Sequence, residues 1–467
     1  MTFTLLSAAM ISAALNQPAE RPVLESGVGT IAVYQNGDLL TDGWRLVAEL
    51  DPDILDASIE DGDGDEVCFV SDIDRFCAAI DAGDTVDFTV RYNGQDHNQR
   101  ITAHYFVPAA RFDAAYQAEH GGEIDITIPA AYELVNIALA LTESLHDRPG
   151  IVVRDTPYYE RVQAHFADVR DHEFVQALDQ LLSAGWSQYH NLKMNGFAFE
   201  IGDDGELRRS AVYDRTGFAG SRNNALMPYF EEMRAFARDS RFLDFYRSER
   251  DFYASQVDFL TRQADAPAMW QWLSDQFPDV AAYDGVRVVF SPLVGNNQSV
   301  TWLQSNGYRE LQPHVNFPYR SIAGLDSEAD ALWRGLILFT EFNHGFINPE
   351  GERYAARINT ILHDRAFWAD DSRSATSYGS PLAVFLEYLN WALPALYYLD
   401  HVESEAERQL MFDTLDAIME RRGFPQYGAL RPVLIELYEA RADRETVADL
   451  YPAIIDWFET HYAEAQR

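Results

Sequence analysis

Lysine is almost absent from this chain. Lys193 is the one lysine among 36 basic side chains, against 74 acidic side chains, in 467 residues with a formal net charge of -38. Phosphate backbones and anionic membrane surfaces repel such a polyanion, which argues against nucleic acid or an anionic membrane as a partner. We attribute the charge to solubility, and the preference for arginine to genome composition.

Long apolar runs are also scarce. After the N-terminus, no segment is apolar and free of charge over the roughly 20 residues that a membrane span needs. The first residues form a short apolar run that ends in Ser12-Ala13-Ala14, which predicts a signal peptide over residues 1–19 and a periplasmic or secreted bacterial protein. The basic segment that normally precedes such a run is missing, so an apolar N-terminal strand is the alternative.

Cysteine is limited to Cys68 and Cys77. If Ser71 to Asp74 form the turn of a hairpin, Val70 pairs with Arg75 and Cys68 lies opposite Cys77. A disulfide is then sterically possible and suits an exported protein. Two buried free thiols are the alternative.

The pattern of apolar residues changes along the chain. Residues 20–110 contain short β-branched and aromatic runs separated by Asn-Gly and Asp-Gly turns, which predict a small β-sandwich. Residues 121–467 are mostly helical in pattern, with a strand at 286–292 and a partner near 299–303. The expected fold class is therefore α+β multidomain, in which the second domain has a short mixed or antiparallel sheet.

The chemically distinctive stretch is residues 336–349, an apolar run interrupted by Glu341, Asn343 and His344. Glu341 and His344 are three residues apart and therefore share one face of a helix. The run differs in one residue from His-Glu-x-x-His, in which two imidazoles bind zinc and the glutamate is the general base. Thr340 stands at the position of the first histidine, and threonine is a poor zinc ligand.

A second apolar helix is expected over residues 381–399, where Glu387 is the only charged residue. A lone carboxylate on such a helix calls for a partner. A glutamate on a later helix supplies the third protein ligand in zinc sites with two histidines and one glutamate, so Glu387 is a candidate ligand. The alternative is a glutamate buried against an arginine from elsewhere in the chain.

The run from Val288 to Asn390 resembles a bacterial family known as domain of unknown function 4932. The matching pieces are the strand that ends in Phe290-Ser291-Pro292-Leu293, the motif over residues 341–349, and Glu387 on its apolar helix. The resemblance covers about residues 121–450 and implies a zincin-like domain of the gluzincin type with peptidase activity. Typical members carry a histidine where this chain has Thr340.

Carried over residue by residue, the resemblance implies that Glu341 is the catalytic base and that His344 and Glu387 bind zinc. Tyr378 would stabilise the oxyanion, although a packing role is the alternative. His314 or His363 is a candidate for the missing imidazole. Zinc would lower the pKa of a bound water to about 7, and Glu341 would accept its proton.

We therefore predict an exported zinc-metallopeptidase-like protein with a degenerate Thr-Glu-x-x-His site that acts on a peptide or protein. The strand at 286–292 is expected to hold an extended peptide through main-chain hydrogen bonds. The alternative is a catalytically inactive zincin homologue that binds peptide or polysaccharide. In that case Glu341, His344, Thr340 and Glu387 form a buried polar network, and Glu341 hydrogen-bonds His344.

Overall fold

The computed structural model describes residues 21–28, 30–35, 37–45, 54–59, 65–80, 85–105, 108–146, 148, 150–185, 188–217, 223–317 and 320–467. The predicted signal peptide, residues 1–19, lies outside them. The chain divides into two compact units, Met1–Val107 and Pro108–Arg467. The mixed α+β class expected from the sequence is confirmed.

The described residues of the first unit form eight strands in two four-stranded sheets, ordered β1-β7-β8-β4 and β3-β2-β5-β6. The strands are β1 (Val23–Ser26), β2 (Thr30–Gln35), β3 (Asp38–Arg45), β4 (Ile54–Ile59), β5 (Asp65–Val70), β6 (Arg75–Ile80), β7 (Thr85–Tyr92) and β8 (Gln95–Tyr105). Both sheets contribute to one apolar core, which includes Leu24 and Phe88 from the first sheet and Val33 and Phe69 from the second.

The hairpin of β5 and β6 has the predicted register. Val70 pairs with Arg75 and Cys68 with Cys77, and the Ser71 N–H donates to the Asp74 carbonyl at 2.9 Å across the turn. Cys68 and Cys77 form a disulfide, so the first of the two alternatives is confirmed. A disulfide indicates an oxidising environment.

The second unit contains a mixed sheet in the order β13-β14-β12-β9. Its strands are β9 (Ile124–Thr127), β12 (Gly285–Ser291), β13 (Ser299–Ser305) and β14 (Tyr308–Asn316). Strand β12 is parallel to both of its neighbours, and β13 is antiparallel to β14. The prediction that the strand at 286–292 receives a peptide is wrong, because β9 and β14 already occupy both of its edges. A short separate hairpin joins β10 (Phe199–Ile201) to β11 (Leu207–Arg209).

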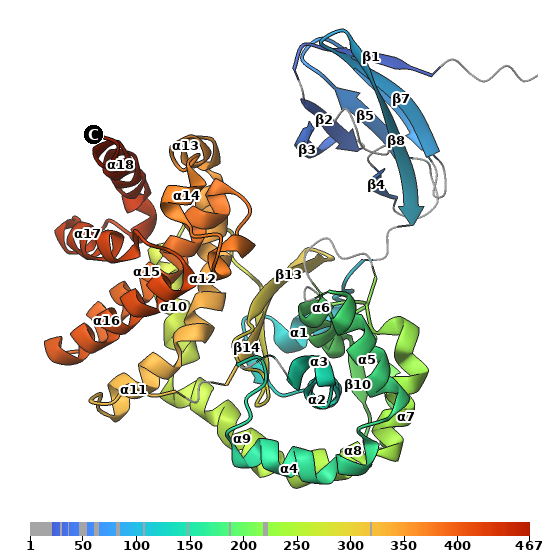
Figure 1. Cartoon of the computed structure of the whole chain (residues 1–467), viewed down its shortest axis with the longest axis vertical. Coiled ribbons are helices and arrows are strands. Elements are labelled where there is room, and N and C mark those ends of the chain that lie inside the picture. Colours follow the sequence, from blue (N-terminus) through green and yellow to red (C-terminus); the bar gives the residue numbers. More distant parts are fainter. Residues whose placement is uncertain are drawn as a thin grey trace, which may run out of the picture. The chain divides into compact units, whose positions relative to one another are not determined.

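Helices make up most of the second unit, and Figure 1 shows β13 and β14 between the green helices and the orange ones. The helices before β12 are α1 (Ala114–His120), α2 (Ala130–Ala140), α3 (Glu143–His146), α4 (Pro157–His165), α5 (Glu173–Ala184), α6 (Gln188–Asn195), α7 (Phe230–Asp239), α8 (Phe242–Ser248), α9 (Arg250–Asp258) and α10 (Ala266–Gln276). Those after β14 are α11 (Ser327–Arg334), α12 (Leu336–Glu352), α13 (Ala355–Ile361), α14 (Arg365–Trp368), α15 (Pro381–His401), α16 (Glu405–Arg422), α17 (Tyr427–Ala440) and α18 (Val447–Ala465). Short 3₁₀ or π turns are η1 (Ala167–Val169), η2 (Gly196–Ala198), η3 (Met227–Tyr229), η4 (Phe259–Gln263) and η5 (Ser374–Ser377).

The two faces of β14 differ in chemistry. One face carries Glu310, Gln312 and His314, all buried toward the helices that precede β12 in the chain. The opposite face carries Leu311, which lies against Gly345 of α12; a Cβ there would come within 3.2 Å of the leucine. Glycine at 345 therefore lets α12 approach the sheet closely, and this approach positions the rest of the α12 motif.

Candidate functional site

The two apolar helices singled out in the sequence pack against each other. Helices α12 and α15 are in contact along their length. The charges of His344 and Glu387 act on one another, as do those of Glu341 and Glu387. Asn390, one turn after Glu387, hydrogen-bonds His344. The predicted convergence of these side chains is therefore present, and we call Glu341, His344, Glu387 and Asn390 the α12–α15 cluster.

Both ring nitrogens of His344 already have partners. The Asn390 side-chain amide donates to Nε2 at 3.0 Å, and Nδ1 donates to the Asn348 side-chain oxygen at 3.2 Å. Asn343 donates to the Asn390 oxygen at 3.2 Å and so orients that amide. Both nitrogens of the His344 ring are therefore engaged by side chains of α12 and α15. Among the described residues, no hydrogen bond joins this ring to Glu341, so the predicted Glu341–His344 bond is absent.

Glu387 is buried against an arginine, which was the alternative to a ligand role. Its Oε1 accepts from Arg422 Nη2 at 2.5 Å and from Trp391 Nε1 at 2.9 Å. Burial raises the pKa of this carboxyl, but the charges of Arg422 and His344 and the hydrogen bonds from Arg422 and Tyr378 together hold the pKa below its usual value. Glu387 is therefore an ionised carboxylate whose counter-ion is Arg422.

A sharp turn follows Arg422 at the end of α16. Helix α16 ends at this residue because Gly423 adopts a left-handed conformation with φ +96°. A Cβ at 423 would come within 3.0 Å of the Arg373 side chain and the Asp370 carbonyl. The loop before α15 is bonded to this turn, since the Asp370 N–H donates to the Gly423 carbonyl at 2.8 Å and the Ser374 hydroxyl to the Arg422 carbonyl at 3.2 Å.

Glu341 is buried, and among the described residues no hydrogen bond to its carboxylate is found. Burial and the charge of Glu387 together raise the pKa of Glu341 to about 7, against the charges of His344, Lys193 and Arg422, which lower it. Lys193, on α6, is completely buried and donates to the Asn297 carbonyl. Burial lowers the pKa of Lys193 to about 7, against a smaller opposing effect of Glu341. The sole lysine therefore belongs to the electrostatic surroundings of this site. The sequence analysis attributed the scarcity of lysine to genome composition and did not predict this position for Lys193.

The remaining predicted site residues have different positions. The Tyr378 hydroxyl accepts from Arg422 Nη2 at 2.7 Å, so this side chain joins the cluster through the arginine. His314 is buried on β14, where Nε2 bonds the Gln312 side-chain oxygen at 3.0 Å, and His363 is exposed and bonds the Thr360 carbonyl at 2.8 Å. Thr340 donates to the Ile337 carbonyl of its own helix at 2.9 Å. No replacement imidazole accompanies His344 among these candidates.

The donor set does not fit zinc. A zinc site needs three or four deprotonated ligand atoms that converge on one point. His344 has no unengaged lone pair, and Glu387 is neutralised by Arg422. Among the described residues, the one group of His, Cys, Asp or Glu with closely spaced ligand atoms is Glu66, Cys68 and Cys77, whose sulfurs are joined to each other. We therefore derive no metal-dependent step.

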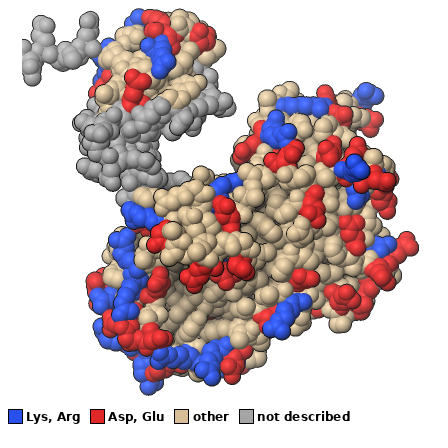
Figure 2. All heavy atoms as spheres, turned by 180° about the vertical axis from the view of Figure 1, so that it is seen from behind, with Lys and Arg blue, Asp and Glu red and all other residues tan. Residues whose placement is uncertain are grey.

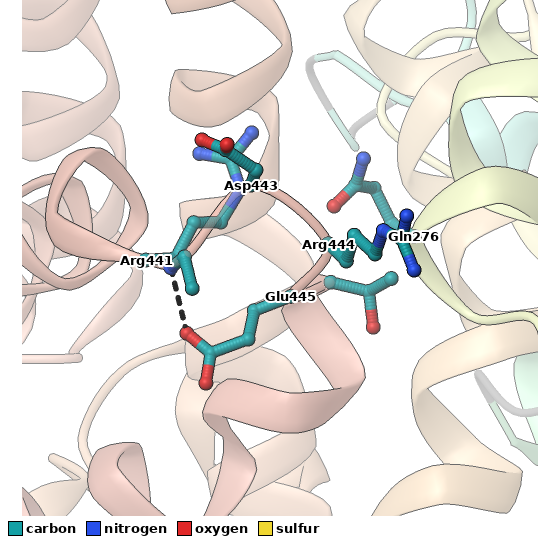
Figure 3. Close-up of a pocket in the computed structure, with 7 residues that line it drawn as sticks. Gln276, Arg441, Asp443, Arg444 and Glu445 are labelled. Carbon is teal, nitrogen blue, oxygen red and sulfur yellow. Dashed lines mark hydrogen bonds between the residues drawn. The ribbon is translucent and has the colours of Figure 1, made fainter.

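Two hollows in the second unit lie elsewhere. One hollow, of about 410 Å³, lies between α17 and α18 and is lined by Gln276 and residues 441–446, which Figure 3 draws as sticks. Its polar groups bond one another: the Ala442 N–H donates to Glu445 at 2.8 Å, and the Val447 N–H at its rim to Gln276 at 3.2 Å. A second hollow, of about 420 Å³, is lined by residues of α2, α3 and α4. Neither hollow includes a member of the α12–α15 cluster.

A further buried carboxylate, Glu133, was not singled out in the sequence, although it too is the only charge on an apolar helix, α2. The Tyr158 hydroxyl donates to its Oε1 at 2.6 Å and also contacts the Tyr253 hydroxyl at 2.7 Å. Burial raises the pKa of Glu133 to about 7, against hydrogen bonds from Tyr158 and Ser291 that lower it. Glu133 therefore favours its protonated form in the folded chain.

Replacement of Glu133 by glutamine should stabilise the protein at alkaline pH. The carboxyl pKa is 4.5 in the unfolded chain and about 7 in the folded one, so the parent loses stability as pH rises from 4.5 to 7. Urea unfolding should show that Glu133→Gln gains about 3 kcal/mol over the parent above pH 7 and little below pH 4.5. The exposed Glu143→Gln should change stability by less than about 0.5 kcal/mol at either pH. An equal gain at both pH values would contradict the prediction.

Comparisons of the chain with protein-family models, curated proteins and solved structures find no match. The resemblance drawn from residues 288–390 therefore remains a prediction, and the function has to be argued from the residues themselves.

Proposed function

We propose that this chain is a catalytically inactive, zincin-like protein that works without a metal and binds an extended peptide by strand addition at β13. The observation that carries the proposal is the edge position of β13. Its only strand partner among the described residues is β14, so one row of main-chain donors and acceptors is left for another strand. The absence of zinc is supported by the contacts of His344 and Glu387.

The chemistry of β13 favours this edge over β9. Trp302, near the middle of the strand, is 48% exposed although it is a large apolar side chain. It pairs with Leu311 and therefore lies on the face that carries α12. An exposed tryptophan beside an unpaired strand edge is typical of a residue that anchors a ligand. The opposite edge strand, β9, is shorter, and its Asp125 is bonded to Arg287.

The charge of the chain narrows the ligand class. The net charge of -38 attracts neutral or cationic peptides rather than acidic ones. Figure 2 shows acidic and basic side chains interspersed over one face of the molecule, with no continuous basic area on that face. The proposed ligand is therefore an extended, neutral or basic polypeptide segment.

The test uses fluorescein-labelled lysozyme that has been reduced and alkylated with iodoacetamide, which is basic and unfolded. We expect binding by fluorescence anisotropy, an intact probe on gels, and no effect of a chelator. Trp302→Ala should weaken binding about tenfold or more, whereas Trp457→Ala on α18 should not. Stoichiometric zinc with chelator-sensitive cleavage would instead support the metallopeptidase, and unchanged binding by Trp302→Ala would reject the β13 site.

A further inference from the structure

An internal cation lies against the α12–α15 cluster. Two buried carboxylates, Glu341 and Glu387, act on each other with like charge. Arg422 is in direct contact with one of them, because its guanidinium lies 2.5 Å from the Glu387 oxygen. Arginine stays charged at any pH that a folded protein tolerates, so this charge cannot be removed by titration.

Arg422 is held from several sides. Besides Glu387, its Nη2 donates to the Tyr378 hydroxyl at 2.7 Å, and the guanidinium carbon lies 4.6 Å from the centre of the Trp391 ring. Arg422 is the last residue of α16 and directly precedes the left-handed Gly423. A group fixed by an ion pair, a hydroxyl and an aromatic face does not leave easily, and a divalent cation near it would be repelled.

We propose that Arg422 takes the place of a divalent cation in the α12–α15 cluster, and that this arginine, together with Thr340, is what keeps the cluster free of metal. The inference rests on the metal-free character of the proposed function. It adds that two changes should let a divalent metal such as zinc bind at His344 and Glu387: removal of the guanidinium, and an imidazole one turn before His344.

The test compares the parent with Thr340→His, Arg422→Ala and the double variant. The measurements are Zn²⁺ retained after dialysis, Zn²⁺ affinity by competition with a chelating dye, and the visible spectrum with Co²⁺. We expect the double variant to bind one equivalent, at least about tenfold more tightly than either single variant, because each change alone leaves one obstacle in place. Arg431→Ala combined with Thr340→His is the matched control. Arg431 forms an ion pair with Asp416, with an N–O distance of 2.7 Å, and is not part of the cluster.

Two results would overturn the proposal. One is Zn²⁺ binding by Thr340→His alone that equals that of the double variant, because Arg422 would then not exclude the metal. The other is a double variant that binds no more Zn²⁺ than the Arg431 control. If Arg422→Ala unfolds the chain, Arg422→Gln takes its place, since an amide can still donate to Glu387. A double variant that stays unfolded in saturating Zn²⁺ also counts against the proposal. The peptide-binding assay on the parent is independent of these outcomes.

Discussion

Replacement of Arg422 by leucine should lower the free energy of unfolding by about 3–5 kcal/mol, which is the usual cost of leaving a buried charge unpaired. Glu387 is 2% exposed and would lose its counter-ion, and Tyr378 would lose the donor to its hydroxyl. The measurement is urea unfolding near neutral pH, followed by the tryptophan fluorescence that Trp391 and its neighbours supply.

A matched pair of variants separates the charge effect from lost packing. Arg422→Leu combined with Glu387→Gln should recover much of the loss, because no ionised carboxylate is then left unpaired. Arg357→Leu removes an arginine that is 42% exposed and bridges Asp456 and Glu459, and it should cost at most about 1 kcal/mol. A loss for Arg422→Leu as small as that for Arg357→Leu would show that Glu387 does not depend on this partner.

The second large effect concerns Lys193. Burial lowers its pKa from 10.5 to about 7, so the unfolded chain binds the proton more tightly between these values. The cost to stability is therefore fully present below pH 7, and stability recovers as pH rises to 10.5. Relative to the parent, Lys193→Met should gain stability below pH 7, and this advantage should shrink by about 4 kcal/mol by pH 10.5.

The single lysine makes the titration directly measurable. Protein labelled with ¹³C at lysine Cε should give one lysine signal, with a midpoint near pH 7 rather than 10.5. Glu341→Gln should move the midpoint lower, because the Glu341 carboxylate favours the charged amine. A signal that titrates at 10.5, or one that Glu341→Gln leaves unmoved, would contradict the electrostatic link between α6 and α12.

Local sequence signals predicted the elements whose causes are local. The β5–β6 hairpin follows from the turn at residues 71–74, which sets the register and brings Cys68 opposite Cys77. These features depend on residues only a few positions apart, so one sequence was enough to find them.

Strand β14 was missed because its stability depends on distant residues. The stretch carries several polar residues and a proline, and it was not predicted as a strand. Its Glu310 is satisfied by the hydroxyls of Tyr116 and Tyr213, far away in the chain. The role of Arg422 was missed for a similar reason. Arg421-Arg422-Gly423 looks like the ordinary basic end of a helix, and no pattern indicates which arginine reaches Glu387. The sequence did predict that Glu387 needs a partner, but not the identity of that partner.

The enclosure of Lys193 determines how the protein reacts with chemical probes. Its side chain is inaccessible in the folded chain, and no other lysine exists anywhere in the sequence. Succinimidyl cross-linkers, cyanate and reducing sugars would therefore find only the terminal amine to modify. Conjugation, surface immobilisation and cross-linking mass spectrometry of this protein call for reagents directed at carboxylates or guanidinium groups.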